Sequence, residues 1–279
     1  MTATTGASRA PPAWGGYLVA NLVASIVAPL RRPRSAWTMR LVPTWQRYAP
    51  YLPPVVAFVA AAMVWLDEPI MRGADLLPPG FRVFVNEMTD FGRGVWPLTP
   101  LVVLFLTGTV LLLPRLSVMT RSVLALATIK VGYMFVAIAL TGLADAIVKR
   151  IIGRARPSAL GAFAYEPLAW RSEYASFPSG HTTNVFATLV AVGFIFPRLR
   201  PLLWVYALAI AASRVIVSSH FSSDAIAGAA FGVFGAVVIR DWFAVRRLGF
   251  YVGSDGRVHP MPGPSFRRLR KVAGALLGQ

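Results

Sequence analysis

Long apolar runs, separated by short polar stretches that carry the charges, dominate the hydrophobic pattern of this chain. A helix needs about 20 apolar residues, with a range of roughly 17–25, to cross the hydrocarbon core of a bilayer. Some of the runs are too short by themselves, so their helices must include flanking residues to cross the bilayer. The third run is long and could project beyond it. The pattern predicts an all-α membrane protein with six transmembrane helices near Pro53–Leu66, Val95–Leu113, Ser122–Val148, His181–Phe196, Leu202–Ser218 and Ala225–Ile239.

The stretch 17–30 has a different pattern. Leu18, Leu22, Ile26 and Leu30 recur every four residues, which is typical of a helix lying in the membrane interface. A floppy N-terminus and a seventh, weak span are the alternative interpretations. The stretch lacks a basic region and a clean small-residue cleavage site, so we do not expect a cleaved signal peptide.

The composition agrees with a membrane protein. Of the 279 residues, 56% are hydrophobic and only 14% are charged, whereas a soluble domain has about 25% charged residues. Disordered and collagen-like classes are excluded. The absence of cysteine excludes disulfides, thiolate metal sites and a cysteine nucleophile. Any histidine chemistry must use His181, His220 or His259.

The net charge of +17 raises the question of whether the protein binds nucleic acid. A nucleic-acid binder would need a basic groove interleaved with aromatic residues, and the charges here instead punctuate the apolar runs. Eighteen of the 28 basic residues lie on one side of the predicted bundle, in the segments before 50, 114–121, 197–201 and 240–279. The positive-inside rule makes that side cytoplasmic, together with both termini. The loops 67–94, 149–180 and 219–224 then face outward.

Three polar clusters stand at outward ends of the predicted spans. They read KRIIGRARP from Lys149, PSGH from Pro178 and SRVIVSSHFSSD from Ser213. Lys149, Arg156 and Arg214 supply cations that can clamp a phosphoryl group. Ser179 adds a hydroxyl donor, and Gly180 lets backbone N–H groups approach closely. These residues therefore predict a phosphate site.

The two histidines of these clusters can supply the chemistry. His220 and Asp224 are four residues apart, so they share one face if the local backbone is helical. A carboxylate on one imidazole nitrogen leaves the other nitrogen free to attack, which makes His220 the predicted nucleophile. His181 is the predicted general acid for the departing oxygen. No dense cluster of Asp, Glu or His remains for a metal, and we expect no cofactor.

The pattern resembles the type 2 phosphatidic acid phosphatase (PAP2) superfamily, whose signature KxxxxxxRP–PSGH–SRxxxxxHxxxD is matched at every fixed position. The motifs cover residues 149–224, and the six-span layout extends over about 51–240. The resemblance implies a metal-independent membrane phosphatase that acts through a phosphohistidine. It implies phosphate binding by five residues and catalysis by three: Lys149, Arg156, Ser179, Gly180 and Arg214, then His181, His220 and Asp224.

The sequence predicts three segments, of which the resemblance covers only the middle one. Residues 1–50 would be a cytoplasmic or interfacial segment, 51–240 a six-helix PAP2-type bundle, and 241–279 a basic cytoplasmic tail. Within the bundle, Asp145 stands four residues before Lys149 and is a candidate partner for it. Arg150, Arg154 and Arg171 are surplus cations. They either pair with Glu166 or Glu173, or recognise a polyanionic headgroup.

The expected function is hydrolysis of a lipid phosphate or pyrophosphate at the outer face of a bacterial cytoplasmic membrane. Candidate substrates are undecaprenyl pyrophosphate, lipid A phosphate, phosphatidylglycerol phosphate and phosphatidic acid. The expected partners are this lipid and the bilayer, and not nucleic acid. A phosphotransferase that uses the same phosphohistidine with a non-water acceptor is the alternative. An anion transporter would show internal repeats and midplane polar residues, and neither is evident.

Overall fold

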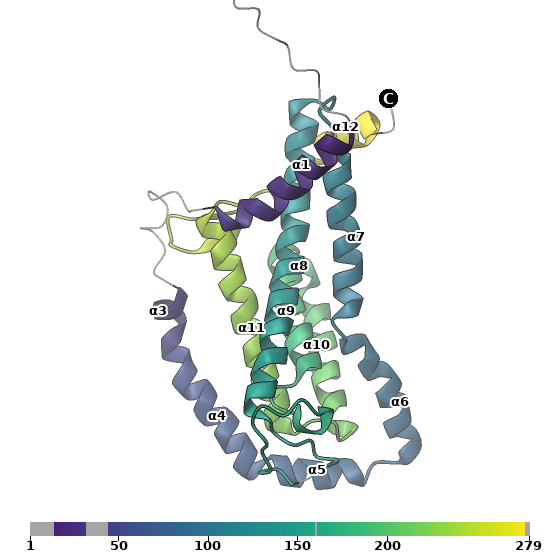
Figure 1. Cartoon of the computed structure of the whole chain (residues 1–279), viewed down its shortest axis with the longest axis vertical. Coiled ribbons are helices and arrows are strands. Elements are labelled where there is room, and N and C mark those ends of the chain that lie inside the picture. The colour runs from purple at the N-terminus through teal and green to yellow at the C-terminus, as the bar shows by residue number, and fades with distance from the viewer. Residues whose placement is uncertain (1–13, 32–43, 160, 277–279) are drawn as a thin grey trace, which may run out of the picture.

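The structure, a computed structural model, describes residues 14–31, 44–159 and 161–276. Most of these residues are helical (Figure 1). Within the described residues, five helical segments are long and apolar enough to cross a membrane: Gln46–Trp65, Pro79–Leu111, Val118–Ile152, Pro197–Ile216 and Ser222–Val245. Four arginines of the predicted cytoplasmic charge, at positions 9, 32, 34 and 40, lie outside the described residues.

A helix occupies each of the six predicted spans. They are α4 (Leu52–Trp65), α7 (Val95–Leu111), α8 (Val118–Ile152), α9 (Gly180–Ile195), α10 (Arg200–Ile216) and α11 (Ser222–Val245). The prediction of an all-α membrane bundle is therefore confirmed. Helix α9 is shorter than the five long segments, yet it packs against α8, α10 and α11. It thus lies in the middle of the bundle (Figure 1).

Small residues let α9 and its neighbours approach closely, as is usual between helices in membranes. A Cβ added to Gly232 of α11 would lie 2.4 Å from the carbonyl oxygen of Thr183 in α9. A Cβ on Gly235 would lie 2.5 Å from Oγ1 of Thr141 in α8. The buried core beside these contacts includes Ala187, which is fully buried. This close packing fixes where the ends of the helices stand relative to one another.

The predicted outward loop 67–94 is largely helical. It contains α5 (Asp67–Asp75), α6 (Pro79–Thr89) and the 3₁₀ turn η3 (Asp90–Gly92). Each helix buries one face: Asp67 and Ala74 of α5 are buried, as are Val85 and Thr89 of α6, while most of their other residues are exposed. Charged residues interrupt its apolar positions, so the segment lacks the long apolar run that predicts a spanning helix.

Helix α1 (Trp14–Val27), followed by η1 (Ala28–Leu30), lies obliquely across one end of the bundle (Figure 1). Asn21 donates from Nδ2 to the carbonyl oxygen of Leu112, at the end of α7, at 2.9 Å. Trp242 donates from Nε1 to the carbonyl oxygen of Pro29 at 2.9 Å. The helix predicted for residues 17–30 is therefore present and is bonded to the bundle; its place in the membrane interface stays a prediction.

The chain after residue 240 remains attached to the bundle. Helix α11 continues to Val245, and an antiparallel hairpin of β1 (Phe250–Val252) and β2 (Val258–Pro260) follows. Phe250 is fully buried in the core. Lys130 of α8 donates to the carbonyl oxygen of Met261 at 2.7 Å. The remaining elements are α3 (Thr44–Tyr48), η2 (Ala49–Tyr51), η4 (Ser172–Tyr174), η5 (Pro197–Leu199) and α12 (Phe266–Leu276).

Candidate active site

The three sequence motifs meet at one end of the bundle, the end opposite α1 and α12 (Figure 1). Helices α8 and α10 end there, and α9 and α11 begin there. The first motif begins in the last turn of α8 and continues beyond it, and the second opens α9. The third runs from the last turn of α10 through a short turn into α11. The packing of these helices therefore brings distant parts of the sequence together.

Lys149 lies in the last turn of α8, where two oxygen atoms hold its ammonium group. Nζ is 2.8 Å from Oδ2 of Asp145 and donates to the carbonyl oxygen of Pro178 at 3.2 Å. The predicted pairing with Asp145 is thus confirmed, and Asp145 also accepts from Oγ1 of Thr183 at 3.0 Å. A Cβ on Gly180 would lie 2.9 Å from Nζ of Lys149. Glycine therefore leaves room for Lys149 beside the start of α9.

Ser179 is the fully buried N-cap residue of α9. Its backbone N–H donates to the carbonyl oxygen of Asp224 at 3.0 Å, which joins the second motif to the third. Oγ1 of Thr182 donates to Oγ of Ser179 at 3.1 Å. The proton on the Ser179 hydroxyl is consequently left to donate elsewhere. The N–H groups in the first turn of a helix also favour an anion.

His181 is the second residue of α9 and packs beside η3. A Cβ on Gly92 would lie 3.0 Å from Cδ2 of His181, so glycine there permits the close approach of the ring. The positive charges of Arg214 and Lys149 act on the imidazole of His181. The residue predicted as the general acid therefore lies among the other predicted site residues.

Arg156 is aimed at the site by the turn that ends α8. Gly153 has a φ of 63°, and a Cβ there would lie 1.8 Å from the carbonyl oxygen of Glu166. After this turn, Nε of Arg156 donates to the carbonyl oxygen of Ser172 at 3.0 Å. Burial lowers the pKa of Arg156, and the carboxylate of Asp224 opposes this shift. The guanidinium therefore lies within electrostatic range of the third motif.

Arg214 lies in the last turn of α10 and is buried. Its Nη1 donates to Oγ1 of Thr89 at 3.0 Å, while its Nε has no hydrogen-bond partner among the described residues. Its carbonyl oxygen accepts from the backbone N–H groups of Ser219 and His220, at 3.1 and 3.2 Å. Arg214 thus offers a spare donor and anchors the turn that carries His220.

His220 is held by a backbone oxygen. Its Nδ1 lies 2.8 Å from the carbonyl oxygen of Ser176, but 3.8 Å from Oδ2 of Asp224, too far for a hydrogen bond. A carbonyl only accepts, so Nδ1 carries the proton and Nε2 keeps a free lone pair. Burial lowers the pKa of His220 to about 4, against the opposing effect of Asp224. His220 is therefore neutral at pH 7.

Asp224 lies beside His220 as expected, with Oδ2 3.8 Å from Nδ1, but the two residues do not have the helical geometry expected for the pair. His220 precedes α11, whose N-cap is Phe221, so the two residues share no helical face. Oδ2 of Asp224 instead accepts from the backbone N–H of Phe221 at 2.9 Å and from Oγ of Ser176 at 2.6 Å. Asp224 thus acts on the imidazole by way of its neighbours. Sequence reasoning missed Ser176, because a main-chain carbonyl oxygen has no residue signature.

Two of the surplus cations make surface interactions. Arg171 is 2.8 Å from Oε2 of Glu166, and both side chains are exposed. Arg150 donates from Nη1 to the carbonyl oxygen of Arg171 at 2.9 Å. The predicted ion pair with Glu166 is therefore confirmed for Arg171.

Arg154 differs from both interpretations of the surplus cations. It is 0% exposed, so it neither pairs with Glu166 or Glu173 nor faces a headgroup. Its Nη2 lies 2.8 Å from Oδ2 of Asp67, and its Nη1 lies 2.6 Å from Oδ1 of Asp224. Asp67 is the first residue of the segment 67–94, which the sequence predicts as an outward loop. Its partner, Arg154, lies 87 positions away in sequence, and only the fold reveals the contact.

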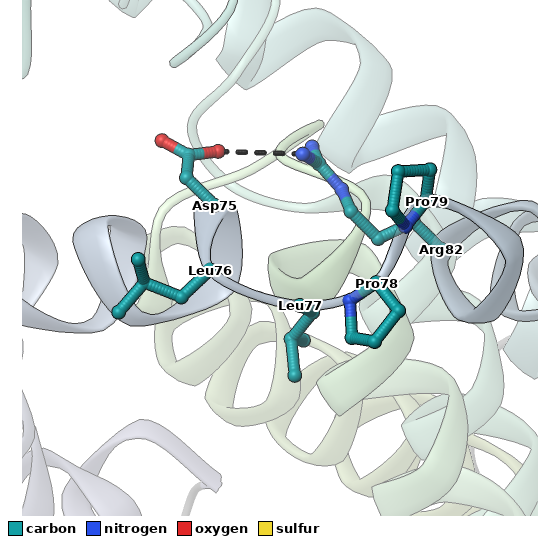
Figure 2. A pocket seen from close by; sticks show the side chains of 6 residues that line it. All are labelled: Asp75, Leu76, Leu77, Pro78, Pro79 and Arg82. Carbon is teal, nitrogen blue, oxygen red and sulfur yellow. Dashed lines mark hydrogen bonds and ion pairs between the residues drawn. The ribbon is translucent and has the colours of Figure 1, made fainter.

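The α5–α6 junction touches the turn that carries His220. Figure 2 shows the pocket there, of about 590 Å³, with Asp75 and Arg82 joined across one side of the connecting segment. Nη1 of Arg82 is 3.5 Å from Oδ1 of Asp75, and its Nη2 donates to Oγ of Ser218 at 2.9 Å. Farther along, Oγ1 of Thr89 accepts from Oγ of Ser213 at 2.8 Å. The amphipathic helices therefore support the third motif.

Together these groups suit reaction at a phosphorus atom. The imidazole of His220 has a free lone pair, and three cations lie at the same end of the bundle, where they can stabilise negative charge on phosphoryl oxygens. The donors are Lys149, Arg156 and Arg214. Among the residues that the structure describes, no three His, Asp or Glu gather as a metal site.

Comparison with known families gives a match to the PAP2 superfamily over residues 130–248. A protein named lipid A 1-phosphatase from Rhizobium johnstonii is 32% identical over 225 residues, which are 76% of this chain and 91% of that protein. A protein of the same name from Rhizobium etli is 33% identical over 202 residues, which are 71% of this chain and 86% of that protein.

The fold of this chain resembles that of a solved membrane protein. It is described as the first transmembrane PAP2 type phosphatidylglycerolphosphate phosphatase, from Bacillus subtilis. The TM-score is 0.51 at 22% sequence identity, with 72% of this chain and 95% of that chain covered. The similarity shows a shared bundle architecture.

Proposed function

This chain belongs to the PAP2 superfamily and is a membrane lipid phosphatase, and from that premise we propose that it hydrolyses the 1-phosphate of a lipid A-type glycolipid through a phosphohistidine. The observation that carries the mechanism is the hydrogen bond of 2.8 Å between Nδ1 of His220 and the carbonyl oxygen of Ser176. This bond orients the ring and leaves the lone pair on Nε2 for attack.

The reaction has two steps. In the first, Nε2 of His220 bonds to phosphorus while the bond from phosphorus to the lipid oxygen breaks, and His181 gives a proton to that oxygen. In the second, His181 takes a proton from water, and the water oxygen displaces Nε2 from phosphorus. Inorganic phosphate and free His220 are the products, so the atoms and protons balance over one turnover.

The cations stabilise both transition states. Arg214 has a buried Nε with no hydrogen-bond partner in the described chain, and a phosphoryl oxygen would satisfy it. Lys149 and Arg156 contribute further positive charge, and Ser179 contributes a hydroxyl proton. Such preorganised donors are worth more in a water-poor site than in bulk water. These roles are the ones that the sequence motifs predicted.

Two observations support the choice of substrate. The relatives named lipid A 1-phosphatase align over most of their length. The chain is also built for the bilayer, and a lipid is held there by about 0.8 kcal/mol for each buried CH₂. A site at the end of a membrane bundle receives the phosphate while the acyl chains stay in the membrane. By the positive-inside rule, that end faces the outside of a bacterial cytoplasmic membrane.

A phosphate-release panel tests the proposal. The purified protein in detergent would receive lipid A, undecaprenyl pyrophosphate, phosphatidylglycerol phosphate or phosphatidic acid, one lipid at a time. We expect the largest kcat/KM with lipid A, with loss of the 1-phosphate and release of inorganic phosphate. Preference for another lipid would overturn the substrate. Release of phosphate only when a second lipid or sugar acceptor is present would instead indicate a phosphotransferase.

A further inference from the structure

A buried guanidinium links two carboxylates behind the nucleophile. The side chains of Arg154, Asp67 and Asp224 are each 0% exposed. Arg154 lies 2.8 Å from Asp67 and 2.6 Å from Asp224, using a different Nη atom for each carboxylate. Its guanidinium also lies 4.3 Å from the ring centroid of Phe221. A planar fork can make both contacts at once, whereas a lysine ammonium offers only one point of charge.

Asp67 also holds the start of α11 directly. Its Oδ1 accepts from Oγ of Ser222 at 2.7 Å and from the backbone N–H of Ser223 at 2.8 Å. Its Oδ2 accepts from Oγ of Ser223 at 2.5 Å. Arg154 donates to Oγ of the same serine at 2.7 Å. The first residue of α5 is therefore bonded to the turn of helix that follows His220.

The network reaches His220 through Asp224. Oδ1 of Asp224 is occupied by Arg154 at 2.6 Å, while Oδ2 accepts from Ser176 and from the backbone N–H of Phe221. Ser176 supplies the carbonyl oxygen that binds Nδ1 of His220. Each link is a hydrogen bond between buried groups, so movement of Arg154 would displace the carboxylate that holds both neighbours of the nucleophile.

Stability alone does not account for such a cluster. Burying an ion pair costs desolvation energy that often equals or exceeds the Coulombic gain, and an apolar replacement of similar volume is often as stable. The two carboxylates raise the pKa of Arg154 against the effect of its burial, so the guanidinium keeps its charge. A charged, fully bonded network is valuable where one geometry must be held to within a fraction of an ångström.

We propose that Asp67 and Arg154 are positioning residues for the nucleophile: Arg154 bridges Asp67 to Asp224, and this bridge holds His220 in line for attack. The inference rests on His220 being the nucleophile of the proposed function. It adds a role for the amphipathic segment after α4, because α5 begins at Asp67. The residues act through Asp224 and do not touch the substrate.

The first experiment compares burst kinetics of Asp67→Asn and Arg154→Lys with wild type, using 4-nitrophenyl phosphate. The burst amplitude reports the fraction of competent enzyme, and the burst rate constant reports phosphorylation of His220. We expect a fall of about 10- to 100-fold in the rate constant, since a displacement of about 1 Å can cost that much. The Kd for the substrate, obtained from the concentration dependence of the burst rate constant, should stay close to wild type, and the amplitude should fall only where phosphorylation no longer outpaces hydrolysis of the phosphohistidine.

Glu68→Gln is the matched control. It removes a carboxylate from the next residue of α5, where Glu68 is exposed and pairs with Arg72. We expect its burst rate constant to equal that of wild type. A loss of burst amplitude in Asp67→Asn at an unchanged rate constant would mean that the pair serves folding alone, and the proposal would be overturned.

A double-mutant cycle distinguishes a positioning role from a purely structural one, because it measures whether the effect of Asp67 on the burst rate constant depends on Asp224. If Asp67 acts through Asp224, Asp67→Asn should change the rate constant less than about twofold in an Asp224→Asn background, because residues acting as a unit are not additive. If Asp67→Asn lowered the rate constant in the Asp224→Asn background as much as it does in wild type, the proposal would be overturned. Turnover by His220→Ala would instead refute the nucleophile, so the failures of the two proposals are distinguishable.

Discussion

At the scale of single residues, the site depends on how one imidazole is held. Nδ1 of His220 is bonded to a main-chain oxygen, and its own main-chain N–H is bonded to the carbonyl oxygen of Arg214. Backbone atoms in a packed bundle move less than long side chains. The free Nε2 is therefore presented by rigid parts of the fold, which is the arrangement that a covalent nucleophile requires.

Removal of the imidazole should abolish turnover. We expect His220→Ala to lower kcat by at least about 10³-fold, the scale seen when a covalent nucleophile is lost. Phosphate release from lipid A measures the effect. His259→Ala is the control, because His259 lies on the hairpin strand β2 at the other end of the bundle. Comparable losses in both variants would contradict the assignment.

The fall of kcat/KM at acid pH should report the pKa of the His220 imidazole. The nucleophile must be neutral, and its pKa is lowered to about 4 by burial. We therefore expect kcat/KM for 4-nitrophenyl phosphate to hold at pH 6 and to fall as the pH drops through about 4. Asp224 raises this pKa, so Asp224→Asn should move the acid limb to lower pH while reducing the rate. A limb near the ordinary pKa of about 6.5 would contradict a buried imidazole.

At the scale of elements, helix ends carry the chemistry. The chain leaves α8 through Gly153 in the left-handed region and returns towards the site as residues 154–156. Helix α9 begins at the site, so the N–H groups of its first turn and its positive dipole end favour an anion there. At the start of α11, the carboxylates of Asp67 and Asp224 already accept from backbone N–H groups. The amphipathic helices α5 and α6 add contacts to the same turn from the outside.

Gly153→Ala tests the turn at the end of α8. A Cβ there would lie 1.8 Å from the carbonyl oxygen of Glu166, in a backbone conformation with a φ of 63°. Such strain costs about 1–3 kcal/mol, so we expect a lower thermal midpoint and a loss of activity as Arg156 shifts. Gly161→Ala is the control, since nothing lies within 4 Å of its added Cβ. Equal midpoints for the two variants would show that the turn tolerates a side chain.

At the scale of the whole molecule, the bundle separates a reactive end from a basic end. The three motifs lie at one end, whereas α1, the hairpin and α12 lie at the other (Figure 1). The basic residues of α12 include Arg267, Arg268, Arg270 and Lys271, all exposed. Such a segment suits the anionic inner leaflet. The charge asymmetry thus predicts the orientation of the bundle in the membrane.

The absence of cysteine makes that orientation measurable. Ser158→Cys places a thiol at an exposed position in the loop after α8, and Ser254→Cys places one at an exposed position in the hairpin. In spheroplasts, a membrane-impermeant maleimide should label Ser158→Cys directly and Ser254→Cys only after permeabilisation. The reverse pattern would place the site on the cytoplasmic side.

Much of the fold was predictable because it depends on local patterns. Apolar run lengths predicted α4 and α7 to α11, and the amphipathic spacing of residues 17–30 predicted α1. The loop 67–94 was misread, because helices α5 and α6 bury only part of their surfaces and carry several charges. One-sided helices of this kind are recognised only when the surface that they cover is known.

The sequence by itself determined the membrane class and the spanning helices, and it predicted the phosphate-site residues, because hydrophobic run length and motif spacing are local properties of the chain. Only the tertiary structure decided that Ser176, and not Asp224, bonds Nδ1 of His220. It alone joined Asp67 to Arg154 across 87 positions. Backbone carbonyls carry no residue code, and the partner of a buried charge is chosen by helix packing, so neither contact could be read from the order of the residues.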